Sequence, residues 1–256
     1  IKLDKQLAPV GEVLSSRLLE EVPLELFGIK KAKLIEMIAN APLKVTAFIS
    51  TLSQVANTYN LTQENFYFAM LRSYQEMNDN YFEDIEKAAV KFRSEFGLPS
   101  SGVIPSTDLK QILEDRFGYR VEENDFSDFP KLTHIRSVYI EEAKKILINA
   151  KMAENQKAFL YAKEIGYQFL EMSGERALMT PWPRATSFDH LLNNSRASSF
   201  AGAVLISADS LVDQLTETFS SSKWSSRRLL TVLESYNSSP EMFMIRLLNI
   251  IPKQFG

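Results

Sequence analysis

Apolar residues recur every three or four positions over long stretches of this chain, which is the spacing of one face of an α-helix. The clearest run lies between residues 62 and 97 and carries Phe66, Met70, Tyr74, Met77, Tyr81, Ile85, Ala88 and Phe92. This spacing predicts one long helix that continues to about Phe96 and ends at Gly97. The cluster Asn78-Asp79-Asn80 can break or bend that helix, because its side chains compete for backbone hydrogen bonds.

Shorter segments with the same spacing follow, and only a few segments resemble strands. Helices are expected at about 106–116, 153–172, 188–205, 208–219, 225–236 and 240–251, and strands at 119–122, 134–140 and 145–150. The stretch 173–187 contains two prolines and is predicted to be a loop. Together these elements predict an α+β protein that is mostly helical. A helical region is expected over residues 1–100, and a second domain with a small sheet over residues 101–256.

Cysteine and histidine are too scarce for most metal and nucleophile chemistry. The 256 residues include no cysteine, which excludes disulfides, a cysteine nucleophile and thiolate metal sites. The two histidines, His134 and His190, cannot form a three-histidine zinc site, and we interpret each as a structural or surface residue. The GxGxxG, phosphate-loop and GxSxG motifs are absent. The net charge of −3 gives no overall basic footprint for nucleic acid.

Nothing in the sequence indicates a membrane protein. No apolar run approaches the roughly 18–20 residues that are needed to span a bilayer. The first ten residues lack the charged-then-apolar layout of a signal peptide. We therefore expect a cytoplasmic protein, and we interpret both abrupt ends of the chain as cuts from a longer one.

Three segments, in order, match the pattern of one metallopeptidase-like family. The segment QKAFLYAKEIGY at 156–167 resembles the zinc-binding helix of the IrrE/ImmA family, whose pattern runs roughly Q-R-F-x-x-A-H-E-L-G-H. NSRASSFAGAVL at 194–205 resembles the family's E-x-x-A-N-x-F-A-A-x-L-L helix, and SPEMFMIRL at 239–247 resembles its closing V-S-x-x-A-x-x-R-L element. The resemblance covers about residues 100–256 and implies a zincin-like domain.

The metal-binding positions of that helix hold unsuitable residues in this chain. A zincin helix carries two histidines at i and i+4, and a glutamate between them activates a metal-bound water. Lys163 and Tyr167 stand at the two histidine positions, and Asn194 stands where the family has its third ligand. Only Glu164 keeps its place. A lysine ammonium repels zinc and tyrosine is a poor zinc ligand, so we expect no metal, no cofactor and no catalytic residue here.

The four side chains instead predict an altered pocket that binds a small anion. Lys163 supplies a positive charge, while Tyr167 and Asn194 supply hydrogen bonds. Three arginines on neighbouring segments are further candidates for contacts with the anion: Arg136, Arg184 and Arg196. The alternative is that Lys163 and Glu164 only form ion pairs with neighbouring side chains or face solvent.

A narrower resemblance concerns regulators that have lost the zinc ligands. Segments 153–172, 191–206 and 239–256 are similar to the sensor region of the short-chain fatty acyl transcriptional regulators, bacterial proteins with an N-terminal XRE-type helix-turn-helix. This implies a ligand-sensing and dimerisation domain whose effector is a small carboxylate or an acyl-CoA-like molecule. It also implies a homodimer that reaches DNA only through a helix-turn-helix upstream of residue 1, with the helix from Tyr67 to Phe96 as the relay.

Two other functions remain open at this point. The chain can be an active peptidase of the IrrE/ImmA type, which predicts that it binds zinc. It can also be a protein-interaction module without a ligand. In that case, substituting Lys163 and Tyr167 changes local stability only and alters no response to a metabolite.

Overall fold

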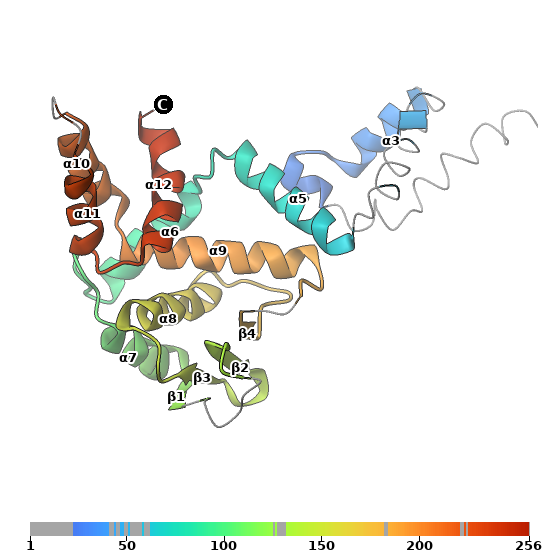
Figure 1. The fold of residues 1–256 in the computed structure, drawn as a ribbon. Helices are drawn as coiled ribbons and strands as arrows, with labels where there is room; N and C mark the ends of the chain where they lie inside the picture. Colours follow the sequence, from blue (N-terminus) through green and yellow to red (C-terminus); the bar gives the residue numbers. More distant parts are fainter. Residues whose placement is uncertain are drawn as a thin grey trace, which may run out of the picture. The chain divides into compact units, whose positions relative to one another are not determined.

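The computed structural model describes residues 23–40, 44, 47–48, 51, 58, 62–124, 126, 132–181, 184–220, 223 and 225–255. Within them the chain is mostly helical and forms one small sheet of four strands (Figure 1). The helical elements are η1 Leu24–Phe27, α3 Lys31–Asn40, α5 Gln63–Met77, α6 Glu83–Glu95, α7 Ser106–Phe117, η3 Glu141–Ala143, α8 Glu154–Phe169, α9 Phe188–Leu205, α10 Ala208–Phe219, α11 Ser226–Ser235 and α12 Pro240–Phe255. The strands are β1 Arg120–Asn124, β2 Ser137–Ile140, β3 Lys145–Asn149 and β4 Met179–Thr180. The predicted fold class, α+β and mostly helical with a small sheet, is confirmed.

The sheet has the strand order β1-β3-β2-β4. β1 runs parallel to β3, whereas β2 is antiparallel to both β3 and β4. The first three strands lie where the sequence predicts them, but β4 falls inside the stretch 173–187, which was predicted to be a loop. That prediction is wrong for two residues, because β4 exists only through its pairing with Ser137 and Val138 of β2. A two-residue strand has no periodicity of its own to detect.

The predicted long helix is interrupted between α5 and α6. Asp79 and Asn80 adopt left-handed backbone conformations, with φ of 52° and 56°. Asparagine and aspartate tolerate this region better than other residues with a side chain, but a helix cannot continue through it. The amide of Asn80 donates to the carbonyl of Gln75 at 2.8 Å, which closes α5. The prediction of one continuous helix is therefore wrong, and the polar cluster is the place where it breaks.

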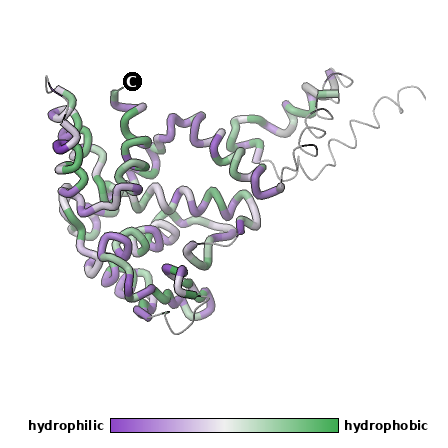
Figure 2. The backbone as a smooth tube through the Cα atoms, viewed as in Figure 1, coloured by the Kyte–Doolittle hydropathy of each residue, from purple (hydrophilic) through white to green (hydrophobic). Residues whose placement is uncertain are grey.

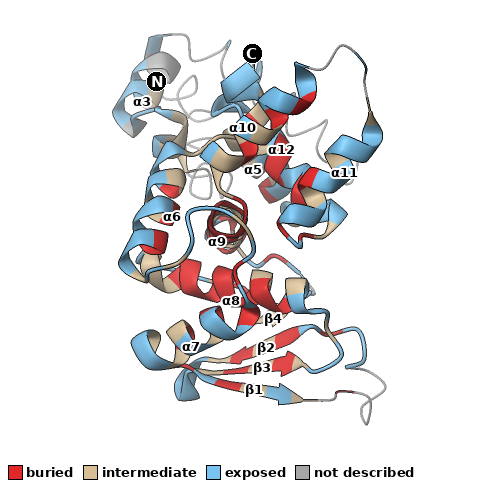
Figure 3. Ribbon diagram, turned by 90° about the vertical axis from the view of Figure 1, so that its left-hand side faces the viewer, coloured by how far each residue is buried: buried red, intermediate tan, exposed pale blue. Residues whose placement is uncertain are grey.

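Helices α8 and α9 pack closely against each other at the centre of the second half of the chain (Figures 1 and 3). At the contact, a Cβ atom on Gly166 would lie 3.0 Å from the Phe200 ring and 3.3 Å from Ala197. Glycine at this position of α8 therefore allows a close approach of α9. Every residue of α8 from Lys157 to Tyr167 is buried except Phe159. A helix so deeply buried holds its polar side chains away from bulk water.

The chain divides into two compact units, residues 1–74 and residues 75–256. The division lies ahead of residue 100 because α6 packs with the second unit. Its residues Ile85, Ala89 and Phe92 belong to the same hydrophobic core as α7, α8 and α9. The assignment of residues 1–100 to a linker and dimerisation region stays a prediction. Among the helices that the structure describes, none is both long and apolar enough to cross a membrane.

Candidate functional site

Lys163 and Tyr167 lie one turn apart on α8 and are both buried, with exposed fractions of 7% and 4%. The N-terminus of α8 is capped: the side chain of Gln156 accepts a hydrogen bond from the amide of Ala153 at 3.3 Å. From this start, the i to i+4 spacing places Lys163 and Tyr167 on one face of the helix, as the sequence predicts. Burial makes their polar groups costly unless they find partners.

Tyr167 is connected to α9. Its hydroxyl donates to the Oδ1 atom of Asn194 at 3.4 Å. Burial raises the pKa of Tyr167, so the hydroxyl stays protonated and remains a donor at neutral pH. The structure therefore brings together Tyr167 and Asn194, two of the residues that the sequence analysis assigned to one pocket.

Arg176 is the main component of this site that sequence reasoning missed. It follows α8 in the predicted loop, and its guanidinium forms an ion pair with Glu164. The guanidinium carbon lies 4.0 Å from the ring centroid of Tyr167 and 4.1 Å from that of Tyr139. Arg176 also donates to the hydroxyl of Tyr119 at 3.3 Å. The Glu164 carboxylate is therefore paired within the protein, which the alternative interpretation of this residue expects.

The charges of this ion pair are nearly hidden from solvent. The exposed side-chain fractions are 12% for Arg176 and 7% for Glu164. Burial by itself would lower the pKa of Arg176, but the charge of Glu164, the neighbouring Tyr119 and the hydrogen bonds to both together outweigh it and raise the pKa overall. One N–H group of Arg176 has no acceptor: its Nε atom is buried and makes no hydrogen bond with any part of the chain that the structure describes.

Lys163 has no counter-charge of its own. Its ammonium makes no hydrogen bond and no ion pair with any described residue. The pKa of Lys163 falls to about 8, chiefly because burial disfavours the charged ammonium. The charge of Glu164 opposes this fall, and that of Arg176 adds to it. Two cations thus share one carboxylate in a buried cluster, which leaves an excess positive charge whenever Lys163 is protonated.

The three predicted arginines do not join this cluster. The side chain of Arg196 forms an ion pair with Asp84 of α6 at 2.6 Å. Arg136 and Arg184 are exposed, and neither side chain makes a hydrogen bond or ion pair within the described ranges. Their contact with an anion stays a prediction, whereas Arg176, which no sequence motif distinguishes, is in place.

The histidines have the roles expected of structural or surface residues. His134 is exposed. His190 is buried in the first turn of α9, where its amide donates to the hydroxyl of Ser187 at 3.1 Å. The Nδ1 atom of His190 lies 3.0 Å from the hydroxyl of Thr186. Burial lowers the pKa of His190, which favours the neutral ring at pH 7.

The donor set around Glu164 does not fit a zinc ion. Among the described residues, no group of three histidine, cysteine, aspartate or glutamate side chains comes together. Glu164 is the one carboxylate in the cluster, and its partner is the Arg176 guanidinium. A metal there would have to displace that guanidinium and tolerate the Lys163 ammonium, and both cations oppose it.

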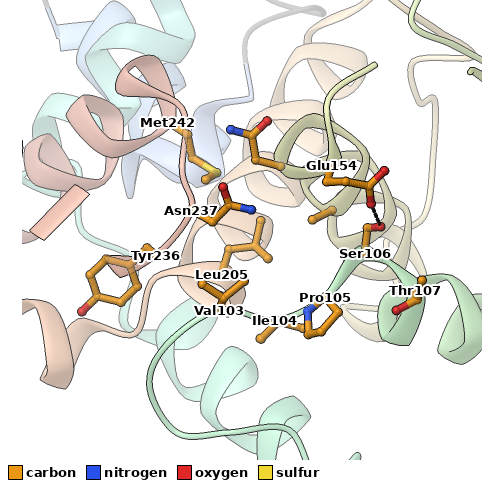
Figure 4. A pocket seen from close by; sticks show the side chains of 12 residues that line it. Val103, Ile104, Pro105, Ser106, Thr107, Glu154, Leu205, Tyr236, Asn237 and Met242 are labelled. Carbon is orange, nitrogen blue, oxygen red and sulfur yellow. Dashed lines mark hydrogen bonds between the residues drawn. The ribbon is translucent and has the colours of Figure 1, made fainter. Parts of the chain in front are cut away.

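A separate cavity of about 240 Å³ lies at the N-terminal ends of α7 and α8 (Figure 4). Its lining is Val103, Ile104, Pro105, Ser106, Thr107, Glu154, Asn155, Ala158, Leu205, Tyr236, Asn237 and Met242. Its one charged side chain, Glu154, accepts a hydrogen bond from Ser106 at 2.5 Å. Glu154 precedes Lys163 by nine residues, or about 13 Å along α8. None of the predicted site residues lines this cavity, so it is distinct from the cluster around Lys163.

Comparison with known proteins finds similarity in structure but not in sequence. No protein-family model matches the chain, and no curated protein matches it. A solved structure described as a Mycobacterium tuberculosis transcriptional regulator is similar, with a TM-score of 0.55 and 19% sequence identity. The similarity covers 74% of this chain and 54% of the regulator, so the chain spans about half of that protein's length. At this identity the likeness shows a shared fold.

Proposed function

We propose that this chain is the ligand-sensing and dimerisation part of a bacterial XRE-type transcriptional regulator and has no metallopeptidase activity. Its effector is a small carboxylate or an acyl-CoA-like molecule. Two lines of support are independent of each other. The fold is similar to that of a solved transcriptional regulator, and Lys163, Glu164 and Arg176 form a largely buried cluster with excess positive charge.

The observation that carries the proposal is the unpaired ammonium of Lys163. Burying a cation without a partner is costly, and a protein removes this cost by pairing the charge or by lowering the pKa. Lys163 has a lowered pKa and no partner among the residues that the structure describes. A bound carboxylate would supply the missing counter-charge, and the free Nε–H of Arg176 offers a second donor to it.

Three consecutive residues of α9 offer a route from this site to the helices α5 and α6. Asn194 accepts the hydrogen bond from Tyr167. Its neighbour Ser195 accepts a hydrogen bond from Gln75 at 3.0 Å, and Arg196 forms an ion pair with Asp84. Gln75 and Asp84 flank the interruption between α5 and α6. A ligand that moves Asn194 would therefore change the conformation of the segment between α5 and α6. This agrees with the relay role expected of residues 67–96.

Calorimetric titration of the purified chain at pH 7 with acetate, butyrate and butyryl-CoA tests the proposal. We expect at least one of these anions to bind, and Lys163→Met to weaken its binding at least about tenfold, since a charge-assisted contact is lost. We also expect binding to weaken above about pH 8, where the ammonium loses its proton.

Lys157→Met is the matched control. Lys157 is buried on the same helix, but its ammonium is already paired with Glu123 at 2.8 Å and Glu154 at 3.3 Å. This variant should bind the anion as tightly as the unmodified chain does. Equal weakening by both substitutions, or no binding of any of the three anions, would count against the sensor. Stoichiometric binding of added zinc, with proteolytic activity, would favour the peptidase instead.

A further inference from the structure

The cavity at the N-terminal ends of α7 and α8 is a site that the proposed function does not use. Its other walls come from the C-terminal ends of α9 and α11 and from the first turn of α12. Its volume of about 240 Å³ exceeds the roughly 150 Å³ that suffices to hold benzene in a protein interior. The cavity therefore has room for a ligand somewhat larger than benzene.

The larger part of the cavity wall is apolar. Ile104, Ala158 and Leu205 are buried residues that line it. Met242 adds a flexible thioether from α12, a helix that is hydrophobic along much of its length (Figure 2). Water beside such a wall finds few hydrogen-bond partners, so an apolar group that displaces it gains affinity.

Tyr236 contributes its ring to the cavity, because its hydroxyl is engaged elsewhere. That hydroxyl lies 2.8 Å from the hydroxyl of Ser210 and accepts a hydrogen bond from Gln214 at 3.1 Å. Figure 4 shows the hydroxyl pointing away from the other labelled side chains. Tyr236 therefore extends the apolar wall and offers no polar group to a ligand.

The charge of Glu154 is already balanced within the protein. Its Oε2 atom accepts the hydrogen bond from Ser106, and its Oε1 atom lies 3.3 Å from the ammonium of Lys157. The hydrogen bond from Ser106, helped by Lys157, lowers the pKa of Glu154, so the carboxylate is ionised at neutral pH. A bound anion would be repelled by this carboxylate, and a bound cation would find its counter-charge taken. The lining therefore favours an uncharged ligand.

Two carboxamides give the cavity a polar edge. Asn155 lies in the first turn of α8, and Asn237 follows α11. Both side chains line the cavity, and neither carboxamide makes a hydrogen bond with any described residue. Figure 4 shows Asn237 beside Leu205, facing the wall that carries Glu154. Each carboxamide offers two N–H donors and one carbonyl acceptor, which is the set that an amide group can match with its own acceptor and donor.

We propose that this cavity binds a small uncharged molecule in which an amide or lactam group is joined to an apolar group. The apolar group fills the space between Ile104 and Leu205, and the amide exchanges hydrogen bonds with Asn155 and Asn237. Such a ligand differs in chemical class from the anion expected at Lys163. The inference depends on the cavity alone and holds whether or not the proposed function is correct.

A titration of the 256-residue chain with benzamide tests the proposal. Methyl NMR is the readout, because Ile104, Leu205 and Met242 place methyl groups at the cavity. We expect these three signals to shift in a saturable way, with a dissociation constant of about 1 mM or below for so small a ligand. Benzoate has the same shape but is negatively charged, and it should bind in the cavity at least about tenfold more weakly because Glu154 repels it.

Substitution of the two asparagines tests the recognition of the amide. Asn155→Ala and Asn237→Gly should each weaken benzamide binding about two- to tenfold, since one uncharged hydrogen bond is lost. Glycine is the replacement at 237 because the backbone there is left-handed, with φ of 47°. Gln111→Ala is the control. It removes an exposed carboxamide from α7 outside the lining and should leave binding unchanged.

A filled cavity should bind nothing. Ala158→Leu extends a side chain into the space and should abolish the benzamide shifts, and the methyl spectrum of this variant shows whether it is folded. If it does not fold, the asparagine variants still decide the question. Methyl signals that benzamide leaves unmoved would overturn the proposal. Equal binding of benzoate in the cavity, or an affinity that neither asparagine substitution changes, would overturn it too.

The same samples separate this cavity from the site at Lys163. Lys163→Met should bind benzamide as tightly as the unmodified chain does, and Asn155→Ala should bind butyrate as the unmodified chain does. Loss of benzamide binding in Lys163→Met would overturn the assignment of the amide to a separate cavity. A chain that binds benzamide but none of the anions would contradict the sensor alone.

Discussion

Two groups of buried cations lie in the second unit, and their surroundings differ. Arg93 and Arg246 are 5% and 2% exposed, yet both guanidinium groups have hydrogen-bond partners. Arg93 donates to the carbonyls of Val204 and Ser100 at 2.7 and 2.6 Å, and Arg246 donates to the carbonyl of Ile206 at 2.9 Å and pairs with Glu86. Lys163, 7% exposed, has neither kind of partner among the described residues.

The difference shows that burial of a charge does not by itself identify a binding site. Burial lowers the pKa of Arg93 to about 10, so the guanidinium is still protonated at pH 7. Its hydrogen bond to the carbonyl of Val204 stabilises the C-terminal end of α9. These arginines tie α6 and α12 to α9. Lys163 is also buried, but no described residue supplies a counter-charge to its ammonium. An anion from solution would supply that counter-charge. A buried cation therefore indicates a candidate anion-binding site only when no residue of the protein pairs with it.

The largest loss of stability should come from removing Arg246, whose buried charge is paired with Glu86. Arg246→Met leaves the carboxylate of Glu86, only 14% exposed, without its partner. Breaking a buried pair in this way costs about 3–5 kcal/mol. We expect that loss in the free energy of unfolding, measured by urea denaturation at pH 7. The exposed Arg228→Met should change it by less than about 0.5 kcal/mol. A cost below about 1 kcal/mol for Arg246→Met would show that the compensation is weaker than its geometry indicates.

Substitution of Lys163, the buried cation without a described partner, should instead raise the free energy of unfolding. Burial lowers the pKa of Lys163 from 10.5 to about 8, so below about pH 8 the folded state holds a proton at a cost of about 3 kcal/mol. Lys163→Met removes this cost and should stabilise the chain by up to that amount at pH 7. The gain should shrink as the pH rises from 8 towards 10.5, because the folded unmodified chain then releases the proton. Thermal unfolding at pH 7 and pH 10 measures both; a gain independent of pH would contradict the lowered pKa.

The smallest effect on stability should come from the contact that links α9 to α6. Arg196→Ala removes a partly exposed ion pair with Asp84, which is worth below about 1 kcal/mol. Anion affinity should change by no more than about fivefold, because coupling between two sites is reciprocal and cannot exceed the energy of this pair. Hydrogen exchange of α6, measured with and without bound butyrate, should lose its response to the ligand in this variant. A response that persists unchanged would remove Arg196 from the relay.

Much of the local structure could be predicted from the sequence. Helix α10 has the predicted bounds, and α8 places Lys163 and Tyr167 on one face, because a helical period depends only on residues three and four positions apart. The same reasoning found the polar cluster at which α5 ends, but it could not decide that the helix breaks there. That outcome depends on how α6 packs in the core.

The spacing of most helices, the absence of cysteine and the absence of histidine from α8 can be read from the sequence alone. The folded chain alone reveals that Arg176, from a stretch without periodicity, pairs with Glu164 and that Lys163 has no partner among the described residues. It also reveals which of the apolar residues of α12 face the core and which are exposed. The physical reason is that local spacing sets which side chains share a face. What that face meets is set by packing between segments that lie far apart in the chain.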